Sequence, residues 1–145
     1  MRLPLAALAF ASFLAACNPR LGVRPGEVSA ADVRAEGGFW LTEGATADLD
    51  SNFRFTLVDV VSDRRCPANA MCVVAGEAVV VVGPSHPNMR FAPDTLRLSE
   101  GPGGRVDTVE VWPYRLVLRE VQPYPGTEVD GSAPTPRRAR FERVQ

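Results

Sequence analysis

The sequence predicts an all-β domain, and three observations support this prediction. From residue 38 onward, short apolar and β-branched segments recur between Gly, Pro, Asp and Ser. No segment shows a sustained apolar face with helical spacing. About seven or eight such segments fit within residues 38–145, which is the size of a small immunoglobulin-like β-sandwich. A small β-barrel is the alternative, because it produces a similar strand pattern.

The first expected strands are set by the turn residues around them. Residues 39–41 form a short apolar segment that ends at a Glu-Gly pair, and residues 45–49 are expected to return beside it. Residues 53–57 alternate between apolar and polar side chains, which is the pattern of a strand with one buried face. The alternation is lost at residues 58–61, which predicts either a β-bulge or a strand end that is buried on both faces.

The later strands are predicted from the same apolar segments and turn residues. Residues 78–82 are apolar without interruption and predict a central strand buried on both faces. Residues 95–98 predict a short strand near an edge, and residues 106–112 follow a Gly-Pro-Gly-Gly turn. Residues 114–119 alternate clearly, and residues 138–144 are expected to form the last strand. The predicted core includes Phe53, Phe55, Leu57, Val79, Val81, Leu116 and Leu118.

The N-terminus has the features of a bacterial export signal. Met1-Arg2 precedes an apolar run that is too short to span a bilayer and that ends in small residues. Leu14-Ala15-Ala16-Cys17 resembles the lipobox of bacterial lipoproteins. In that family the Cys thiol receives a diacylglycerol, the chain is cut just before it, and the new amino group is acylated. The resemblance implies a signal peptide over residues 1–16 and a lipid-anchored Cys17.

The expected organisation after the signal is a tether followed by one domain. Residues 17–37 are rich in Pro, Gly and charged side chains and predict a flexible tether. Residues 38–145 then form the folded domain, since about 129 mature residues suffice for one core. Asn18 follows Cys17, where lipoproteins retained in the inner membrane of enterobacteria commonly have Asp. This resemblance implies an outer-membrane location that faces the periplasm.

Cys66 and Cys72 remain as an even pair in an exported, oxidising setting. The segment between them is short and turn-prone, so we expect an intramolecular disulfide. A redox site is the alternative, but redox pairs favour the closer Cys-x-x-Cys spacing.

The segment around these cysteines is similar to a group of uncharacterised small bacterial lipoproteins. Asp63-Arg64-Arg65-Cys66-Pro67 and Cys72-Val73-Val74-Ala75-Gly76-Glu77-Ala78 resemble the Arg-Cys-Pro…Cys-Val-Trp-Ala-Gly core of that group. The resemblance implies an exported, β-rich fold with this disulfide, and it implies no known activity. This chain has Val74 where the group has Trp, which puts any contact through that indole in doubt.

The sequence offers few candidates for catalysis or metal binding. Its one histidine, His86, follows Ser85, but adjacent residues point apart and do not form a catalytic dyad. Residues 48–52 cluster oxygen ligands suited to Ca²⁺, yet they lack the Gly and Glu of an EF-hand, and a tight turn explains them better. No basic stripe suited to nucleic acid occurs. We therefore expect no cofactor, no metal site and no nucleic-acid partner.

Aromatic residues near strand ends are the remaining candidates for a binding surface. Trp112, Tyr114 and Tyr124, together with His86, could contact a partner, with core packing as the alternative explanation. The favoured hypothesis is a lipid-anchored, non-enzymatic module of the cell envelope that binds a protein or peptide. The alternative is a lipid-anchored periplasmic hydrolase or metal-dependent enzyme with a carboxylate-based site.

Overall fold

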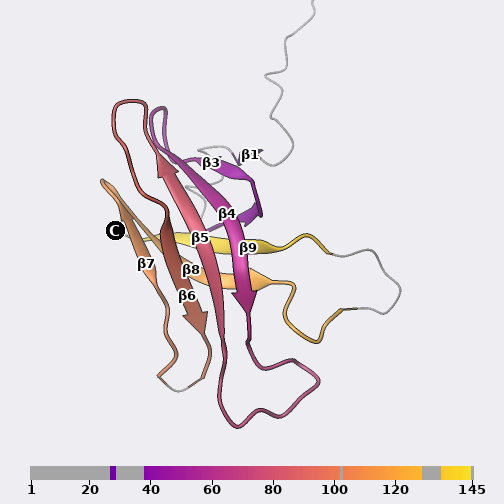
Figure 1. Cartoon of the computed structure of the whole chain (residues 1–145). Helices are drawn as coiled ribbons and strands as arrows, with labels where there is room; N and C mark the ends of the chain where they lie inside the picture. The colour runs from indigo at the N-terminus through magenta and orange to yellow at the C-terminus, as the bar shows by residue number, and fades with distance from the viewer. Residues whose placement is uncertain (1–26, 29–37, 102, 129–134, 145) are drawn as a thin grey trace, which may run out of the picture.

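The protein, described here by a computed structural model, is a sandwich of two β-sheets (Figure 1). The structure describes residues 27–28, 38–101, 103–128 and 135–144. This part of the chain contains nine strands and no helix. The strands are β1 (Glu27–Val28), β2 (Phe39–Thr42), β3 (Thr46–Asp48), β4 (Arg54–Asp63), β5 (Glu77–Ser85), β6 (Asp94–Ser99), β7 (Thr108–Val111), β8 (Tyr114–Gln122) and β9 (Arg138–Val144).

Both sheets are built mainly from strands that follow one another along the chain. The first sheet has the order β1-β3-β4-β5-β6 and the second the order β2-β9-β8-β7. Strand β3 lies in the first sheet and pairs with β4, whereas β2 lies in the second and pairs with β9, so the expectation that residues 45–49 return beside residues 39–41 is wrong. Neighbouring strands are antiparallel except β1 and β3. The predicted β-sandwich is confirmed, and the two separate sheets exclude the barrel. The strand order differs from the ABED and CFG sheets of an immunoglobulin domain, so the likeness to that class lies in size and layering.

The inner faces of the two sheets meet in one apolar core. Phe55 of β4 and Phe141 of β9 are fully buried, and their rings pack edge to face with centroids 4.9 Å apart. Phe39 of β2 extends this contact, with its ring centroid 6.0 Å from that of Phe141. The predicted core residues that the structure confirms are Phe53, Phe55, Leu57, Leu116 and Leu118.

Strand β5 is buried on one face only, so the prediction that Val79 and Val81 belong to the core is wrong. The side chains that reach the core are the alternate ones, Ala78, Val80 and Val82. Val79 and Val81 lie half-buried on the outer face, opposite Arg97 and Thr95 of β6. β-Branched residues are favoured in strands on either face, so this valine run reflects β propensity rather than burial on both sides.

The irregularity predicted at residues 58–61 is present in β4. The register between β4 and β5 shifts between Leu57 and Asp59 and again between Val60 and Ser62. Strand β6 ends its sheet, which confirms the edge position predicted for residues 95–98. Strand β7 ends the other sheet.

The predicted signal peptide and Cys17 lie outside the described residues. Within the predicted tether, Glu27–Val28 forms β1 and pairs in parallel with β3, with Glu27 opposite Thr46. The sheet therefore begins before residue 38, where the domain was expected to start. None of the described residues belongs to a helix that is both long and apolar enough to cross a bilayer.

Candidate functional site

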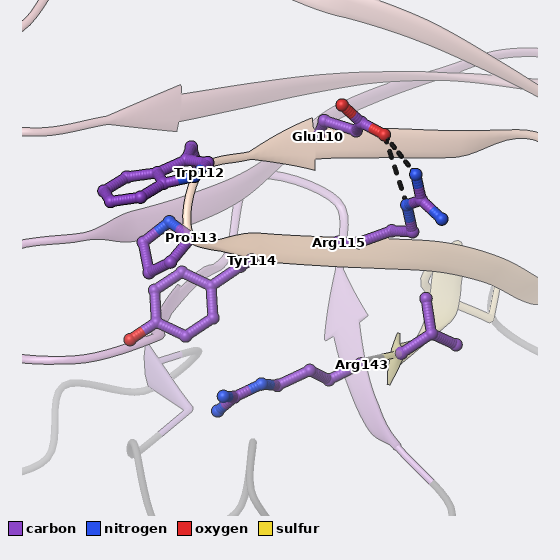
Figure 2. Close-up of a pocket in the computed structure, with 7 residues that line it drawn as sticks. Glu110, Trp112, Pro113, Tyr114, Arg115 and Arg143 are labelled. Carbon is purple, nitrogen blue, oxygen red and sulfur yellow. Dashed lines mark hydrogen bonds and ion pairs between the residues drawn. The ribbon is translucent and has the colours of Figure 1, made fainter.

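An open concavity of about 410 Å³ lies where β7 and β8 meet the end of β9 (Figure 2). We call it the Trp112 site, after its exposed tryptophan. Its lining residues are Glu110, Trp112, Pro113, Tyr114, Arg115, Arg143 and Val144.

The β7–β8 hairpin holds Trp112 toward solvent. Val111 pairs with Tyr114 across the hairpin, so Trp112 and Pro113 alone connect the two strands. Val111 is fully buried and anchors the turn to the core, while 82% of the Trp112 side chain is exposed. Figure 2 shows the indole, the Pro113 ring and the Tyr114 ring one after another along this turn. The hairpin thus presents an apolar surface beside the concavity.

Tyr114 joins the hairpin to the turn between β3 and β4. Its hydroxyl donates a hydrogen bond to Asp50 Oδ2 over 2.5 Å, and its ring meets Phe53 edge on, with centroids 5.9 Å apart. Asp50 Oδ1 accepts the backbone amides of Asn52 and Phe53. The Tyr114 hydroxyl and then these two amides lower the pKa of Asp50 below its ordinary value of 3.8. The oxygen cluster that resembled a Ca²⁺ loop therefore forms a tight turn, and its central carboxylate stabilises that turn.

His86 lies on the same end of the sandwich, in the loop that follows β5. Its ring centroid is 4.5 Å from that of Phe53, which also packs against Phe91 at 6.2 Å. His86 Nδ1 accepts the backbone amide of Asn88, so this nitrogen supports the loop. We call the cluster of Phe53, His86, Phe91 and Tyr114 the aromatic end. Trp112 and two other predicted surface residues, Tyr114 and His86, thus gather around one end of the fold.

Charged side chains border the Trp112 site. Arg115 donates from Nε and Nη2 to Glu110 Oε1 across the hairpin, as Figure 2 shows. The guanidinium of Arg143 lies over the Tyr114 ring, 4.7 Å from its centroid. The site combines an exposed indole with donors and an acceptor at its border, which suits contact with a partner that has both apolar and polar groups.

Tyr124, the fourth predicted surface residue, lies apart from the Trp112 site. Its hydroxyl donates to Glu100 Oε2 over 2.9 Å, and this hydrogen bond raises the pKa of Tyr124. The guanidinium of Arg65 lies 4.5 Å from the centroid of the Tyr124 ring. Tyr124 therefore covers a buried arginine, which is a structural role that its place beside Pro123 and Pro125 did not reveal.

Arg65 is the residue that sequence reasoning missed. Its side chain is 1% exposed, and it donates from Nε and Nη2 to the two carboxylate oxygens of Asp63. Nη2 also donates to the carbonyl of Val121 in β8, over 2.7 Å. Burial opposes the charge most strongly, but the hydrogen bond and charge of Asp63, together with Glu100, raise the pKa of Arg65. The only available signal was its place next to Cys66 in the Arg-Cys-Pro motif.

The predicted disulfide between Cys66 and Cys72 is confirmed, with Cα atoms 5.8 Å apart. It closes a loop at the β4–β5 end of the sandwich, which we call the disulfide loop (residues 66–72). The amide of Ala68 donates to the carbonyl of Pro125 over 2.8 Å. Gly126 lies against this loop so closely that a Cβ there would stand 2.7 Å from Asn69 Oδ1. The Pro-Tyr-Pro-Gly turn and the disulfide loop therefore support each other.

The part of the chain that the structure describes shows no candidate metal site. No group of three or more His, Cys, Asp or Glu side chains there is arranged to hold a metal ion. No family model, curated protein or solved structure matches the chain.

Proposed function

We propose that the protein is a non-enzymatic binding module, held by a lipid on Cys17 at the outer membrane and facing the periplasm. Its contact surface is the Trp112 site, through which it binds an envelope protein or peptide. The observation that carries this proposal is an indole that is 82% exposed on a hairpin anchored by buried Val111, beside a concavity of about 410 Å³. A large, rigid aromatic side chain contributes much contact area and loses little conformational entropy on binding.

The surroundings of the indole support the same function. Tyr114 is fixed by its hydrogen bond to Asp50, and Arg143 is stacked on the Tyr114 ring. Interfaces commonly combine Trp, Tyr and Arg at their centre. The Cys-centred resemblance to small bacterial lipoproteins and the lipobox ending at Cys17 support an anchored module of the envelope.

The anchor predicts that a fatty-acid analogue labels the protein through Cys17. Cells that express the wild-type chain should yield a labelled protein, whereas Cys17→Ser should lose the label because it lacks the lipobox thiol that accepts the diacylglycerol. The measurement is in-gel detection of the label after growth with the analogue. Cys72→Ser serves as the matched control and should keep the label. Equal labelling of Cys17→Ser and wild type would refute the anchor.

The binding surface predicts that Trp112→Ala weakens partner capture at least tenfold, which is the effect of losing a central aromatic contact. The chain is cross-linked in native envelopes, and the captured proteins or peptides are quantified by mass spectrometry. Trp40→Ala is the matched control, because Trp40 is the other tryptophan, a half-buried residue of β2 under the Arg138 guanidinium. A partner retained equally by all three chains would place the contact elsewhere.

A further inference from the structure

The disulfide loop and the four residues after it lie at the end of the sandwich opposite the aromatic end. We call this segment, residues 66–76, the tip. Figure 1 shows the β4–β5 connection at one end and the β5–β6 loop at the other. The side chains of Met71 and Val73 are completely exposed, and that of Val74 is 78% exposed. Residues 66–76 contain no charged side chain. A run of exposed apolar side chains along the chain is typical of a segment that contacts a protein or a membrane.

The tip is held in place at its base. The Cys66–Cys72 disulfide closes the loop, and the amide of Arg64 donates to the carbonyl of Glu77 over 2.9 Å. Gly76 lies so close to the other side of the loop that a Cβ there would stand 1.6 Å from the carbonyl oxygen of Arg64. A surface fixed in this way loses little conformational entropy when it makes contact.

The composition of the tip suits a lipid surface better than a protein. Protein interfaces concentrate Trp, Tyr and Arg at their centres, whereas the tip has no aromatic or charged side chain and is rich in Val and Ala, with one Met. Because the tip has no charge, it enters the headgroup layer without the cost of removing a charge from water. Arg64, exposed at its base, can face anionic headgroups. The polar backbone of a loop limits the depth to that layer.

The length of chain between Cys17 and β1 permits this contact. Ten residues from Cys17 to Glu27 span at most about 35 Å. Glu27 lies level with Thr46, which pairs with Thr56 of β4. From Thr56 to Asp63, the last residue of β4, the strand covers roughly 23 Å at ~3.3 Å per residue. A lipid on Cys17 and the tip can therefore reach one bilayer together, most easily when the domain is tilted.

We propose that residues 66–76 form a membrane-contact surface that rests in the headgroup layer of the bilayer to which Cys17 is anchored. This inference goes beyond the proposed function, and it depends on the lipid at Cys17 only for the reach of the tether. In this orientation the Trp112 site points away from the membrane toward its partner.

The test places a single indole on the tip and asks whether lipid tails quench it. The chain from Cys17 onward, with Trp40→Phe, Trp112→Phe and Val73→Trp, is coupled through the Cys17 thiol to a maleimide phospholipid. Chemical coupling makes the result independent of acylation in the cell. The protein is inserted into vesicles of phosphatidylethanolamine and phosphatidylglycerol (3:1) with or without brominated acyl chains. We expect at least a twofold lower emission in the brominated vesicles.

The matched control carries only Trp40→Phe, so Trp112 is its single indole. Its emission reports whether lipid tails reach the opposite end of the sandwich. Its emission should be the same in both kinds of vesicle. A Val73→Trp emission that brominated lipid leaves unchanged would overturn the proposal, because the tip would then face solvent or a protein. Quenching of Trp112 instead would show that the aromatic end faces the bilayer, which would overturn both this proposal and the outward-facing binding site.

Discussion

Replacing Asp63 by alanine should lower the free energy of unfolding by about 3–5 kcal/mol, because it leaves the Arg65 charge buried without its partner. Arg65 is 1% exposed and donates twice to the carboxylate of Asp63. The carboxylate of Glu100 lies 3.8 Å from Arg65 Nη1 and is itself more than half exposed, so it compensates little. Urea unfolding followed by circular dichroism measures the loss.

Two control variants separate the buried charge from a simple loss of an ion pair. Glu77→Ala removes an exposed pair with Arg97 and should cost less than about 1 kcal/mol. The double variant Asp63→Leu with Arg65→Met removes both charges, so it should be more stable than Asp63→Ala alone. A loss for Asp63→Ala no larger than that for Glu77→Ala would contradict the role given to this pair.

Replacing Phe55 by alanine should cost about 3–5 kcal/mol, since it opens a cavity in the centre of the core. Phe55 has no exposed surface, and its ring packs edge to face on Phe141 of the other sheet. This contact joins the two layers, so its loss affects both. The loss is a large part of the 5–15 kcal/mol that typically stabilises a domain, and thermal and urea unfolding measure it.

Val79→Ala is the matched control on the neighbouring strand. Val79 lies half-buried on the outer face of β5, so its truncation should cost only about 1 kcal/mol. Equal losses for Phe55→Ala and Val79→Ala would show that the outer face of β5 is covered as fully as the core. That result would restore the expectation that β5 is buried on both faces.

Alternation of apolar and polar residues predicted the buried side chains where one face of a strand meets solvent. Phe53, just before β4, and Phe55 and Leu57 within β4 follow this pattern, and all three are buried. Leu116 and Leu118 of β8 are buried as expected, although Val117 between them is buried as well. Val79 and Val81 were wrongly assigned to the core, because an unbroken valine run has no polar residue to mark its outer face. The register shifts of β4 were visible as broken alternation, although their positions needed the structure.

The candidate site was less accessible to sequence reasoning, since contacts between distant residues decide it. Trp112 and Tyr114 are neighbours on one hairpin and were predicted together. The packing of His86 on Phe53 and the hydrogen bond from Tyr114 to Asp50 join segments far apart in the chain. Tyr124 has the same residue type as Tyr114, but it covers Arg65, and only the fold distinguishes the two.

The position of β9 between β2 and β8 has a consequence for how the protein is made. Phe39 of β2 pairs with Phe141 of β9, about a hundred residues later, whereas β3 to β6 pair with successive neighbours. The entropy of closing such a long loop must be overcome before the contact contributes, so local pairings form more readily. A folding chain can thus assemble the β3–β6 meander before β9 completes the second sheet. Until residues 138–144 take their place between β2 and β8, part of the apolar inner face stays uncovered, and such transiently exposed surface favours aggregation.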